Sequence, residues 1–432
     1  MIKKIKVSGY RLLDGFEADL DALTVIIGAN ATGKSTLFDC LRLISGCMDF
    51  PLNALLGYRG GVWTLFNAAG DERNVSWELT FSKPTRGRFW SGFPLQDEPG
   101  YVYEVQLGVD AFGQPLPLYE CLKRAQPYEG HAAPLKYLEA TSTRSMIYDR
   151  EQRRLVPFDQ STTHGAGTEG QLDAPERGAP GIERMQKQDI RLFLSHMRFF
   201  NEYPIPSYAR SLLAMCAFYP GFEVTTNAPI RTKLSEIRPQ TLLSYSGDNL
   251  GTVLHEILTR ADYRDSAEVL REFVGLAYPS FDDLFAETAY GTAPQIVVRI
   301  HEKEMKRPME LWELSDGMLR FLCLATALLN PLPPPMVFID EPETGLHPRL
   351  LPIVGDMIKT AAEQRQVIVT THSPDLLNCF QLDNVAVMKR EGNKAAWYRP
   401  GTRPSLREML ESVTGDTLGD LQRSGELEAL AP

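Results

Sequence analysis

The sequence predicts an α/β fold in which a parallel sheet carries a nucleotide-binding loop. Residues 28–35 fit the phosphate-loop pattern G-x-x-x-x-G-K-[ST], and they follow the apolar run 23–27. Two further apolar runs, 336–339 and 367–369, are each followed by polar or acidic residues. Short apolar runs of this kind are typical of strands buried inside a parallel sheet. The fold expected from these observations is therefore a strand, loop and helix around a nucleotide site.

The phosphate loop predicts its chemistry residue by residue. Gly28 and Gly33 let the backbone turn tightly and present its N–H groups to phosphate oxygens. Lys34 would neutralise the β- and γ-phosphates, and the Ser35 hydroxyl would bind Mg²⁺. A match by chance in a glycine-rich loop is the alternative, but the flanking strand and helix disfavour it. The candidate nucleotide-binding residues here are Gly28, Asn30, Ala31, Thr32, Gly33, Lys34, Ser35 and Thr36.

The second half of the chain supplies acidic and imidazole groups at predicted strand ends. Asp340 and Glu341 follow one apolar run, and His372 follows another. Parallel strands end at a common sheet edge, so Asp340 would bind Mg²⁺ and Glu341 would orient or deprotonate a water molecule. An acidic turn or a strand-end histidine is usually ordinary surface. Their coincidence with a phosphate loop favours the catalytic interpretation, with His372 contacting the γ-phosphate.

Composition indicates an ordinary globular protein. The 432 residues are 43% hydrophobic and 23% charged, and the formal net charge is −10. This charge argues against wholesale non-specific binding of nucleic acid but leaves a local basic groove open. No apolar run reaches the roughly 18 residues needed to span a bilayer, and the N-terminus lacks a signal-peptide pattern. The six cysteines are scattered, so we expect reduced thiols, a cytoplasmic location and no membrane partner.

The pattern along the chain predicts four segments. Residues 1–130 would form the first part of the nucleotide-binding head, with antiparallel strands at 75–81, 101–107 and 116–122. Residues 131–270 would be a mostly helical insertion with a mobile loop near 158–181. Within the insertion, helices are expected at 190–197, from Pro206 onward and at 249–257. Residues 271–395 would complete the head, and 396–432 would be a tail.

One more motif makes a family resemblance visible. Leu-Ser-Asp-Gly at 314–317 precedes an apolar helix, and Ser315 could be only its N-cap. In order, the phosphate loop, this motif, Ile-Asp-Glu-Pro at 339–342 and Thr-His-Ser at 371–373 resemble the ATP-binding-cassette (ABC) ATPases. The stretches 339–348 and 371–374 resemble the prokaryotic SMC/RecF-like branch. That branch includes stand-alone AAA-type ATPases and the overcoming-lysogenisation-defect nucleases.

The resemblance implies roles that the residues alone do not establish. It implies an ABC-type P-loop ATPase head that binds ATP and Mg²⁺ and forms a homodimer or higher oligomer around two ATPs. Ser315 and Gly317 would contact the γ-phosphate of the ATP held by the partner subunit. Glu341 would be the catalytic carboxylate, His372 the switch histidine and Lys34 a catalytic phosphate ligand, while residues 344–347 would cross the dimer interface.

The chain departs from the family pattern in two places. Its signature reads Ser-Asp-Gly-Met where the pattern has Ser-Gly-Gly-Gln. No residue stands out as the glutamine-loop contact, although Gln96, Gln106 and Gln114 lie in the appropriate region. The insertion lacks sustained heptads, which argues against long coiled-coil arms. The residues after His372 lack the D-x-D pair of a nuclease domain, and the Gly-Leu-His-Pro stretch favours the soluble branch over a transporter subunit.

The resemblance implies an ATPase that drives or gates a nucleic-acid-related process or an antiviral defence against phage. The alternative is an ATP-dependent scaffold or sensor that recruits or restrains a separate effector protein with little turnover. Basic residues between 130 and 270 fit either a nucleic-acid groove or a surface for a protein partner. We favour the protein partner and leave DNA binding open. These basic residues are Arg144, Arg150, Arg153, Arg154, Arg184, Lys187, Arg191 and Arg198.

Overall fold

The described chain divides into two compact units. The computed structural model describes residues 1–70, 73–83, 99–158, 189–198, 202–232, 240, 242–290, 294–402, 404, 406–407 and 417–429. Unit 1 consists of Met1–Ile5, Leu12–Arg42 and Met215–Pro432. Unit 2 consists of Lys6–Arg11 and Leu43–Ala214. Strand β1 (Ile2–Ser8) begins in unit 1 and ends in unit 2.

A six-stranded sheet forms the centre of unit 1, and its order is β10-β14-β15-β3-β16-β17. The first five strands are parallel and β17 is antiparallel. Every residue of β3 and β15 is buried, as expected for strands covered on both faces. Because β3, β15 and β14 are parallel neighbours, the residues that follow them meet at one sheet edge. The bounds are β3 (Leu23–Ile27), β10 (Ala217–Tyr219), β14 (Met336–Asp340), β15 (Gln366–Thr370), β16 (Val385–Glu391) and β17 (Lys394–Tyr398).

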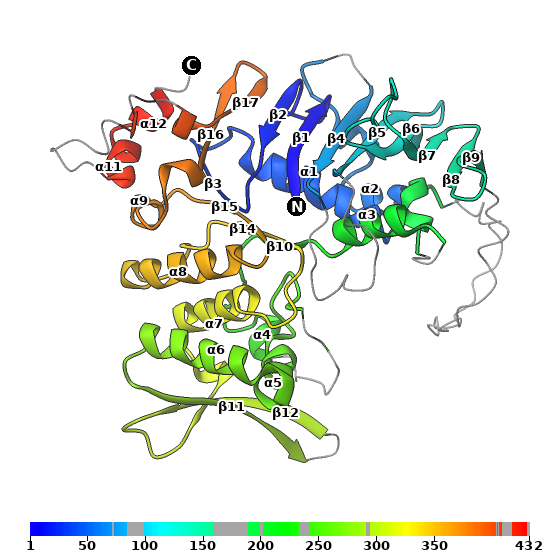
Figure 1. The fold of residues 1–432 in the computed structure, drawn as a ribbon. Helices are drawn as coiled ribbons and strands as arrows, with labels where there is room; N and C mark the ends of the chain where they lie inside the picture. Colours follow the sequence, from blue (N-terminus) through cyan, green and yellow to red (C-terminus); the bar gives the residue numbers. More distant parts are fainter. Residues whose placement is uncertain are drawn as a thin grey trace, which may run out of the picture. The chain divides into compact units, whose positions relative to one another are not determined.

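Helices cover this sheet and share one apolar core with it. Figure 1 shows α8, α7, α6 and α5 stacked between β14 and the β11–β12 hairpin. Their facing side chains, including Leu254, Leu270, Phe321 and Met357, are buried in that core. The remaining elements of unit 1 are short. The bounds are α4 (Pro229–Thr232), α5 (Leu250–Thr259), α6 (Arg264–Ala277), α7 (Asp316–Leu328), α8 (Leu351–Ala362), α9 (Pro374–Leu377), α11 (Leu418–Arg423), α12 (Glu426–Ala429), β2 (Phe16–Asp19), β11 (Phe281–Tyr290), β12 (Pro294–Glu302) and β13 (Met309–Glu310).

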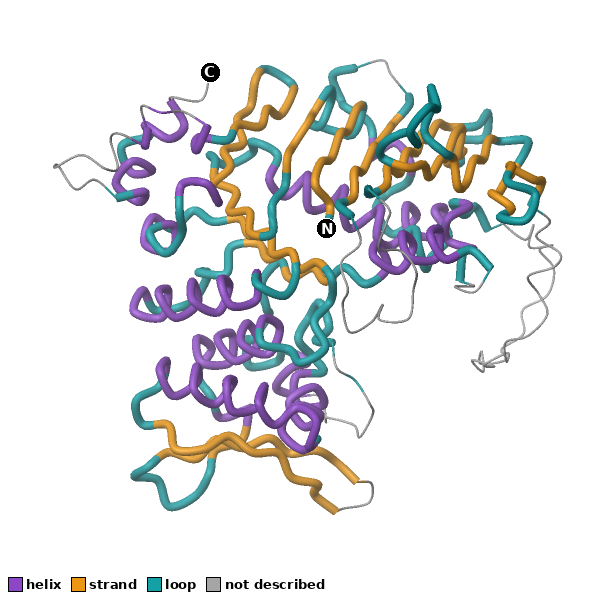
Figure 2. The backbone as a smooth tube through the Cα atoms, in the orientation of Figure 1, coloured by secondary structure: helices purple, strands orange, loops and turns teal. Residues whose placement is uncertain are grey.

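Unit 2 is built on six consecutive antiparallel strands, β4 to β9. Alternate residues of β4 are buried, so one face of this strand packs inward. Figure 2 shows α3 as a helix alongside these strands, and α3 contacts β7. The bounds are α1 (Lys34–Gly46), which passes from unit 1 into unit 2, α2 (Leu52–Gly57), α3 (Pro204–Ala214), β4 (Val75–Phe81), β5 (Tyr101–Val109), β6 (Pro115–Arg124), β7 (Lys136–Thr141), β8 (Ser145–Asp149) and β9 (Arg154–Pro157).

The structure differs from the predicted helices at two places. Residues 190–197 form only a short 3₁₀ turn, Phe193–His196, because the buried Glu120 carboxylate accepts the N–H groups of Phe193 and Leu194 at 2.5 and 2.7 Å. The apolar stripe is thus buried without a longer helix. The helix predicted from Pro206 begins at Pro204 and ends at Ala214. Beyond it, β10 pairs with β14, and Phe218 stacks on Phe338 with ring centroids 4.5 Å apart.

Expectations for several individual strands and helices are confirmed. The three antiparallel strands match β4, β5 and β6, and the helix expected at 249–257 is α5. The segment 131–270, for which mostly helix is expected, also contains the strands β7 to β10. All six cysteines are free, while the loop expected near 158–181 lies outside the described residues from 159 onward. No helix in the described part of the chain is long and apolar enough to cross a membrane.

Candidate nucleotide site

The loop between β3 and α1 has the backbone geometry of a phosphate cradle. Gly28, Ala31 and Gly33 have φ angles of 148°, 63° and 109°, which place three residues of a short loop in the left-handed region. A Cβ atom on Gly28 would lie 2.2 Å from the carbonyl oxygen of Met388, so only glycine fits there. Successive backbone N–H groups in such alternating conformations form an anion-binding nest.

Lys34 is buried and bonded within its own loop. Its Nζ donates to the carbonyl oxygens of Gly28 and Ala29 at 2.7 and 3.0 Å. Burial lowers the pKa of Lys34, and the carboxylates of Glu341 and Asp340 partly oppose that shift. The ammonium group is therefore held over the loop, where a phosphate oxygen could replace the two carbonyls as its acceptor.

Strand β15 lies between β14, which ends at Asp340, and β3, which leads into the phosphate loop. Asp340 pairs in register with Thr370, and Thr370 pairs with Ile26 near the end of β3. The Thr370 hydroxyl donates to the Asp340 carboxylate. Burial raises the pKa of Asp340, while this hydrogen bond and Lys34 oppose the shift. The carboxylate is thus partly desolvated and fixed in direction at the carboxyl edge of the sheet.

Glu341 lies in a strained turn that aims its side chain. Its φ angle is 48°, an uncommon conformation for a non-glycine residue. Its N–H donates to the carbonyl and hydroxyl oxygens of Thr370 at 3.1 and 3.2 Å, which hold the turn. The Glu341 carboxylate lies 3.6 Å from Nε2 of His372. The structure therefore brings the predicted carboxylate and histidine into one site.

Glu343 fixes the turn 371–373 that carries His372, although the sequence motifs did not single out Glu343. Its Oε1 accepts the Thr371 hydroxyl at 2.7 Å and the N–H groups of His372 and Ser373 at 2.8 and 3.1 Å. Three donors on one oxygen hold the backbone that carries His372 against the loop that carries Glu341. Its place two residues after Glu341 was the available signal in the sequence.

The predicted signature residues lie at the start of α7. Ser315 is the N-cap, since its hydroxyl accepts the N–H of Met318 at 3.3 Å. No hydrogen bond among the described residues joins Ser315 to the phosphate loop. On the same helix, Arg320 donates to the carbonyl of Thr344 at 3.0 Å, and a Cβ atom on Gly345 would lie 2.1 Å from its guanidinium. The helix is thus tied to the 341–347 turn of its own chain.

Arg231 holds the signature turn from a distant part of the sequence. Its Nη1 donates to the carbonyls of Trp312 and Leu314 at 2.9 and 2.8 Å, and its Nη2 donates to Asp316 at 2.6 Å. Its Nε donates to the carbonyl of Val224 at 2.7 Å. The Arg231 side chain is only 8% exposed. These contacts explain the aspartate at the second signature position, where the family pattern has glycine.

Two family models match parts of this chain. Residues 1–75 match a family model described as an AAA ATPase domain. Residues 235–378 match an AAA-domain model whose description refers to the AbiEii toxin and the type IV TA system. The Nod factor export ATP-binding protein I of Burkholderia pseudomallei is 30% identical over 117 residues, which are 27% of this chain and 37% of that protein. The ABC transporter G family member 41 of Arabidopsis thaliana is 28% identical over 129 residues, or 26% of this chain and 9% of that protein.

Two solved SMC head structures share the fold. One is an Smc head bound to the C-terminal winged-helix domain of ScpA, with a TM-score of 0.52 and 13% identity over 92% of this chain and 97% of that one. The other, derived from Pyrococcus furiosus, is an Smc head with an extended coiled coil bound to the C-terminal domain of ScpA. It has a TM-score of 0.52 and 12% identity over 95% of this chain and 99% of that one.

Together these findings support an ABC/SMC-like AAA ATPase. The predicted α/β fold, an ABC-type P-loop ATPase head, is confirmed by the SMC head neighbours. The chain spans less than half the length of the two transport-related proteins it matches. For this reason, their activities as whole proteins do not transfer to this ABC/SMC-like ATPase.

The oxygen groups of this ABC/SMC-like ATPase suit magnesium. The Ser35 hydroxyl is exposed and the Asp340 carboxylate is half-buried, and both are ligand types that Mg²⁺ accepts. No group of three or more His, Cys, Asp and Glu residues in the described part of the chain could hold a metal ion alone. This fits an ion that nucleotide phosphates and water also bind. Of the glutamine-loop candidates, Gln106 and Gln114 lie in unit 2 and Gln96 lies outside the described residues.

We expect Arg231→Met to lower the ATPase kcat of this ABC/SMC-like ATPase about 10- to 100-fold, with ATP affinity unchanged. The substitution removes four hydrogen bonds, three of which hold the signature turn, but leaves the phosphate loop intact. Steady-state kinetics and nucleotide titration measure the two quantities separately. Arg271→Met is the matched control, because Arg271 also donates to a carboxylate and a carbonyl, those of Asp283 and Leu284 on β11. A normal kcat for Arg231→Met would contradict the positioning role.

Proposed function

We propose that this chain binds and hydrolyses ATP, and that two subunits close around two ATP molecules. The observation that carries the proposal is the convergence at one sheet edge of the Lys34 loop, the Asp340–Thr370 pair and the Glu341–His372 pair. Phosphoryl transfer to water needs a phosphate cradle, charge neutralisation and a positioned carboxylate. The cradle and Lys34 follow β3, Asp340 and Glu341 lie at the end of β14, and His372 follows β15.

Each residue would have a definite task. Lys34 and the N–H groups of residues 28–36 would bind the β- and γ-phosphates, including those of Asn30, Ala31, Thr32 and Thr36. Ser35 and Asp340 would bind Mg²⁺, which supplies charge neutralisation when present. The Glu341 carboxylate would orient a water molecule, and His372, 3.6 Å from it, would contact the γ-phosphate. Glu343 would keep the His372 turn at the correct distance.

The position of the signature supports the proposed dimer. The hydrogen bond made by the Ser315 hydroxyl stays within its own helix. Ser315 and Gly317 therefore stand at a helix N-terminus that could bind the γ-phosphate of a partner subunit's ATP. ATP would favour the closed dimer and hydrolysis would remove that preference, so the nucleotide would act as a switch between association and release.

We infer that this switch acts in the cytoplasm on a separate effector protein, in a defence process against phage or in a transaction of nucleic acid. Support for defence comes from the family model whose description refers to the AbiEii toxin and matches residues 235–378. The alternative is a scaffold or sensor with little turnover. The Glu341–His372 arrangement favours turnover, because a scaffold needs phosphate binding but no positioned carboxylate.

The oligomeric state in the presence of nucleotide tests the proposal. Light scattering after size exclusion should show that Glu341→Gln protein with ATP and Mg²⁺ doubles its mass relative to the same protein with ADP. The carboxylate is needed for hydrolysis but not for closure, so this variant should trap the closed state. Lys34→Ala protein, treated identically, should not respond to ATP. An equal mass with ATP and ADP for Glu341→Gln would contradict the ATP-sandwiched dimer.

A further inference from the structure

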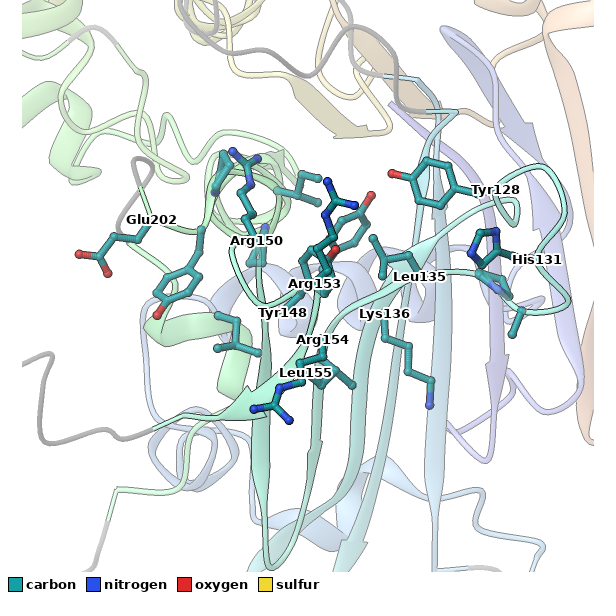
Figure 3. A pocket seen from close by; sticks show the side chains of 18 residues that line it. Tyr128, His131, Leu135, Lys136, Tyr148, Arg150, Arg153, Arg154, Leu155 and Glu202 are labelled. Atoms are coloured by element: carbon teal, nitrogen blue, oxygen red, sulfur yellow. The ribbon is translucent and has the colours of Figure 1, made fainter.

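Unit 2 contains a solvent-open pocket of about 760 Å³ that has no part in the nucleotide chemistry above. Three segments line it: the residues that lead into β7, the turn between β8 and β9, and the start of α3. Figure 3 shows the turn residues Arg150, Arg153 and Arg154 beside Tyr148, with Tyr128 and His131 on the other side. All of these residues belong to unit 2.

The charge of this pocket is strongly positive and largely uncompensated. Arg150, Arg153 and Arg154 form no ion pair with any residue that the structure describes. The Arg154 guanidinium donates only to the neutral amide oxygen of Gln152, at 2.9 and 3.1 Å. Glu202 is the one acidic residue among the lining residues, and in Figure 3 its carboxylate points away from the Arg150 and Arg153 guanidinium groups.

The acidic residue next to these arginines in the sequence forms no ion pair with them that the structure describes. Asp149, next to Arg150, already accepts two hydrogen bonds, because its carboxylate accepts the N–H of Gln152 at 2.8 Å and the Gln152 amide at 3.3 Å.

Arg153 has a φ angle of 51°, in the left-handed region where glycine or asparagine is usual in such a turn. The turn therefore holds a bulky cation at a position that favours a small residue.

Aromatic rings supply the second half of the chemistry. Tyr128, Tyr148 and Tyr203 line the pocket and are all at least partly exposed. Tyr128 is 43% exposed, and the guanidinium carbon of Arg124 lies 3.6 Å from its ring centroid. This stacking fixes the orientation of the Tyr128 ring. The pocket thus combines free guanidinium groups, which suit phosphate oxygens, with ring surfaces, which suit a planar base.

We propose that this pocket binds a nucleotide unit, either a free nucleotide or one belonging to a single strand of nucleic acid. Arg150 and Arg153 would bind the phosphate, and the tyrosine rings would stack on the base. The volume suits one or two nucleotides and is in the range of small-molecule sites. A duplex would hide its bases from these rings. The proposal does not depend on the ATPase site, which lies in unit 1.

A binding experiment on the full chain carrying Lys34→Ala tests this site, because that change silences the phosphate loop. The probe is a fluorescent single strand of about 12 thymidine nucleotides, followed by fluorescence anisotropy. We expect the added pair Arg150→Gln and Arg153→Gln to weaken its binding about tenfold or more. The slope of log K against log salt should also become shallower by about 0.7, because the contact to that phosphate is lost.

Arg144→Gln is the matched control, since Arg144 is an exposed arginine in the turn between β7 and β8 and does not line the pocket. It should leave both the affinity and the salt slope unchanged. Adenosine monophosphate as a competitor distinguishes the sources: displacement of the strand indicates a site for free nucleotides, and failure to displace it indicates a site for a strand. Equal thermal unfolding temperatures establish that the variants are folded. Absence of binding by both probes, or unchanged strand binding in the double variant, would overturn the proposal.

Discussion

Glu341→Gln should lower the steady-state rate of ATP hydrolysis by about 10²- to 10³-fold, within the range that a positioned general base supplies. The reason is local. The Glu341 carboxylate lies 3.6 Å from His372, and its backbone is fixed to Thr370 by two hydrogen bonds. An amide of the same shape keeps these backbone contacts but cannot accept a proton from water. ATP affinity should therefore stay within about twofold of wild type.

Phosphate release and equilibrium binding of a fluorescent ATP analogue measure the two quantities. Glu363→Gln, at the exposed end of α8, is a matched control that should leave both unchanged. A wild-type rate in Glu341→Gln protein would remove this residue from catalysis. A large loss of affinity would show instead that it holds the loop together.

Lys34→Ala and Ser315→Arg should both abolish hydrolysis, but only Lys34→Ala should weaken ATP binding. Lys34→Ala should weaken ATP binding about 100-fold or more, because it deletes a buried cation that no other described residue can replace over the loop. Ser315→Arg should keep ATP binding by its own loop but abolish hydrolysis, since the arginine would fill the space that the partner's γ-phosphate needs. Both changes should reduce turnover below about 1% of wild type.

Ser315→Ala distinguishes a helix-cap role of Ser315 from a contact with the partner's ATP, which a substitution elsewhere on the surface of α7 would not do. It removes the helix cap, worth about 1 kcal/mol, without adding bulk. If Ser315 were only a cap, Ser315→Arg and Ser315→Ala proteins would show the same small loss. A much greater loss of turnover with arginine indicates that another molecule must approach this helix end.

The chemical motifs were predictable from the sequence because their function depends on local order. The loop 28–35 needs glycines, lysine and serine at fixed spacing, and β3, β14 and β15 are apolar enough to read as buried strands. Parallel strands share a carboxyl edge, so the sequence alone predicts that Asp340, Glu341 and His372 lie together. The roles of Asp340, Glu341 and His372 in catalysis remain predictions.

The positioning residues were not predictable, because their contacts span long stretches of chain. Arg231 reaches the signature turn across about 80 residues, and its sequence context is an ordinary polar segment. Similarly, the apolar pattern from Pro206 onward predicts that the helix continues into β10, but Ala217–Tyr219 pairs with Val337–Ile339 instead. Tertiary pairing decided the conformation there. The periodicity of a local sequence does not show that a distant strand such as β14 will pair with it.

Mixing Lys34→Ala and Ser315→Arg subunits is the most direct test of two ATPs shared between two subunits. In a mixed dimer one site combines both changes, whereas the other combines an intact Lys34 from one subunit with an intact Ser315 from its partner. Random pairing of equal amounts should restore about a quarter of the wild-type hydrolysis rate in a symmetric dimer, although each variant alone is inactive. A mixture as inactive as its components would contradict the account, because each subunit would then supply its whole site alone.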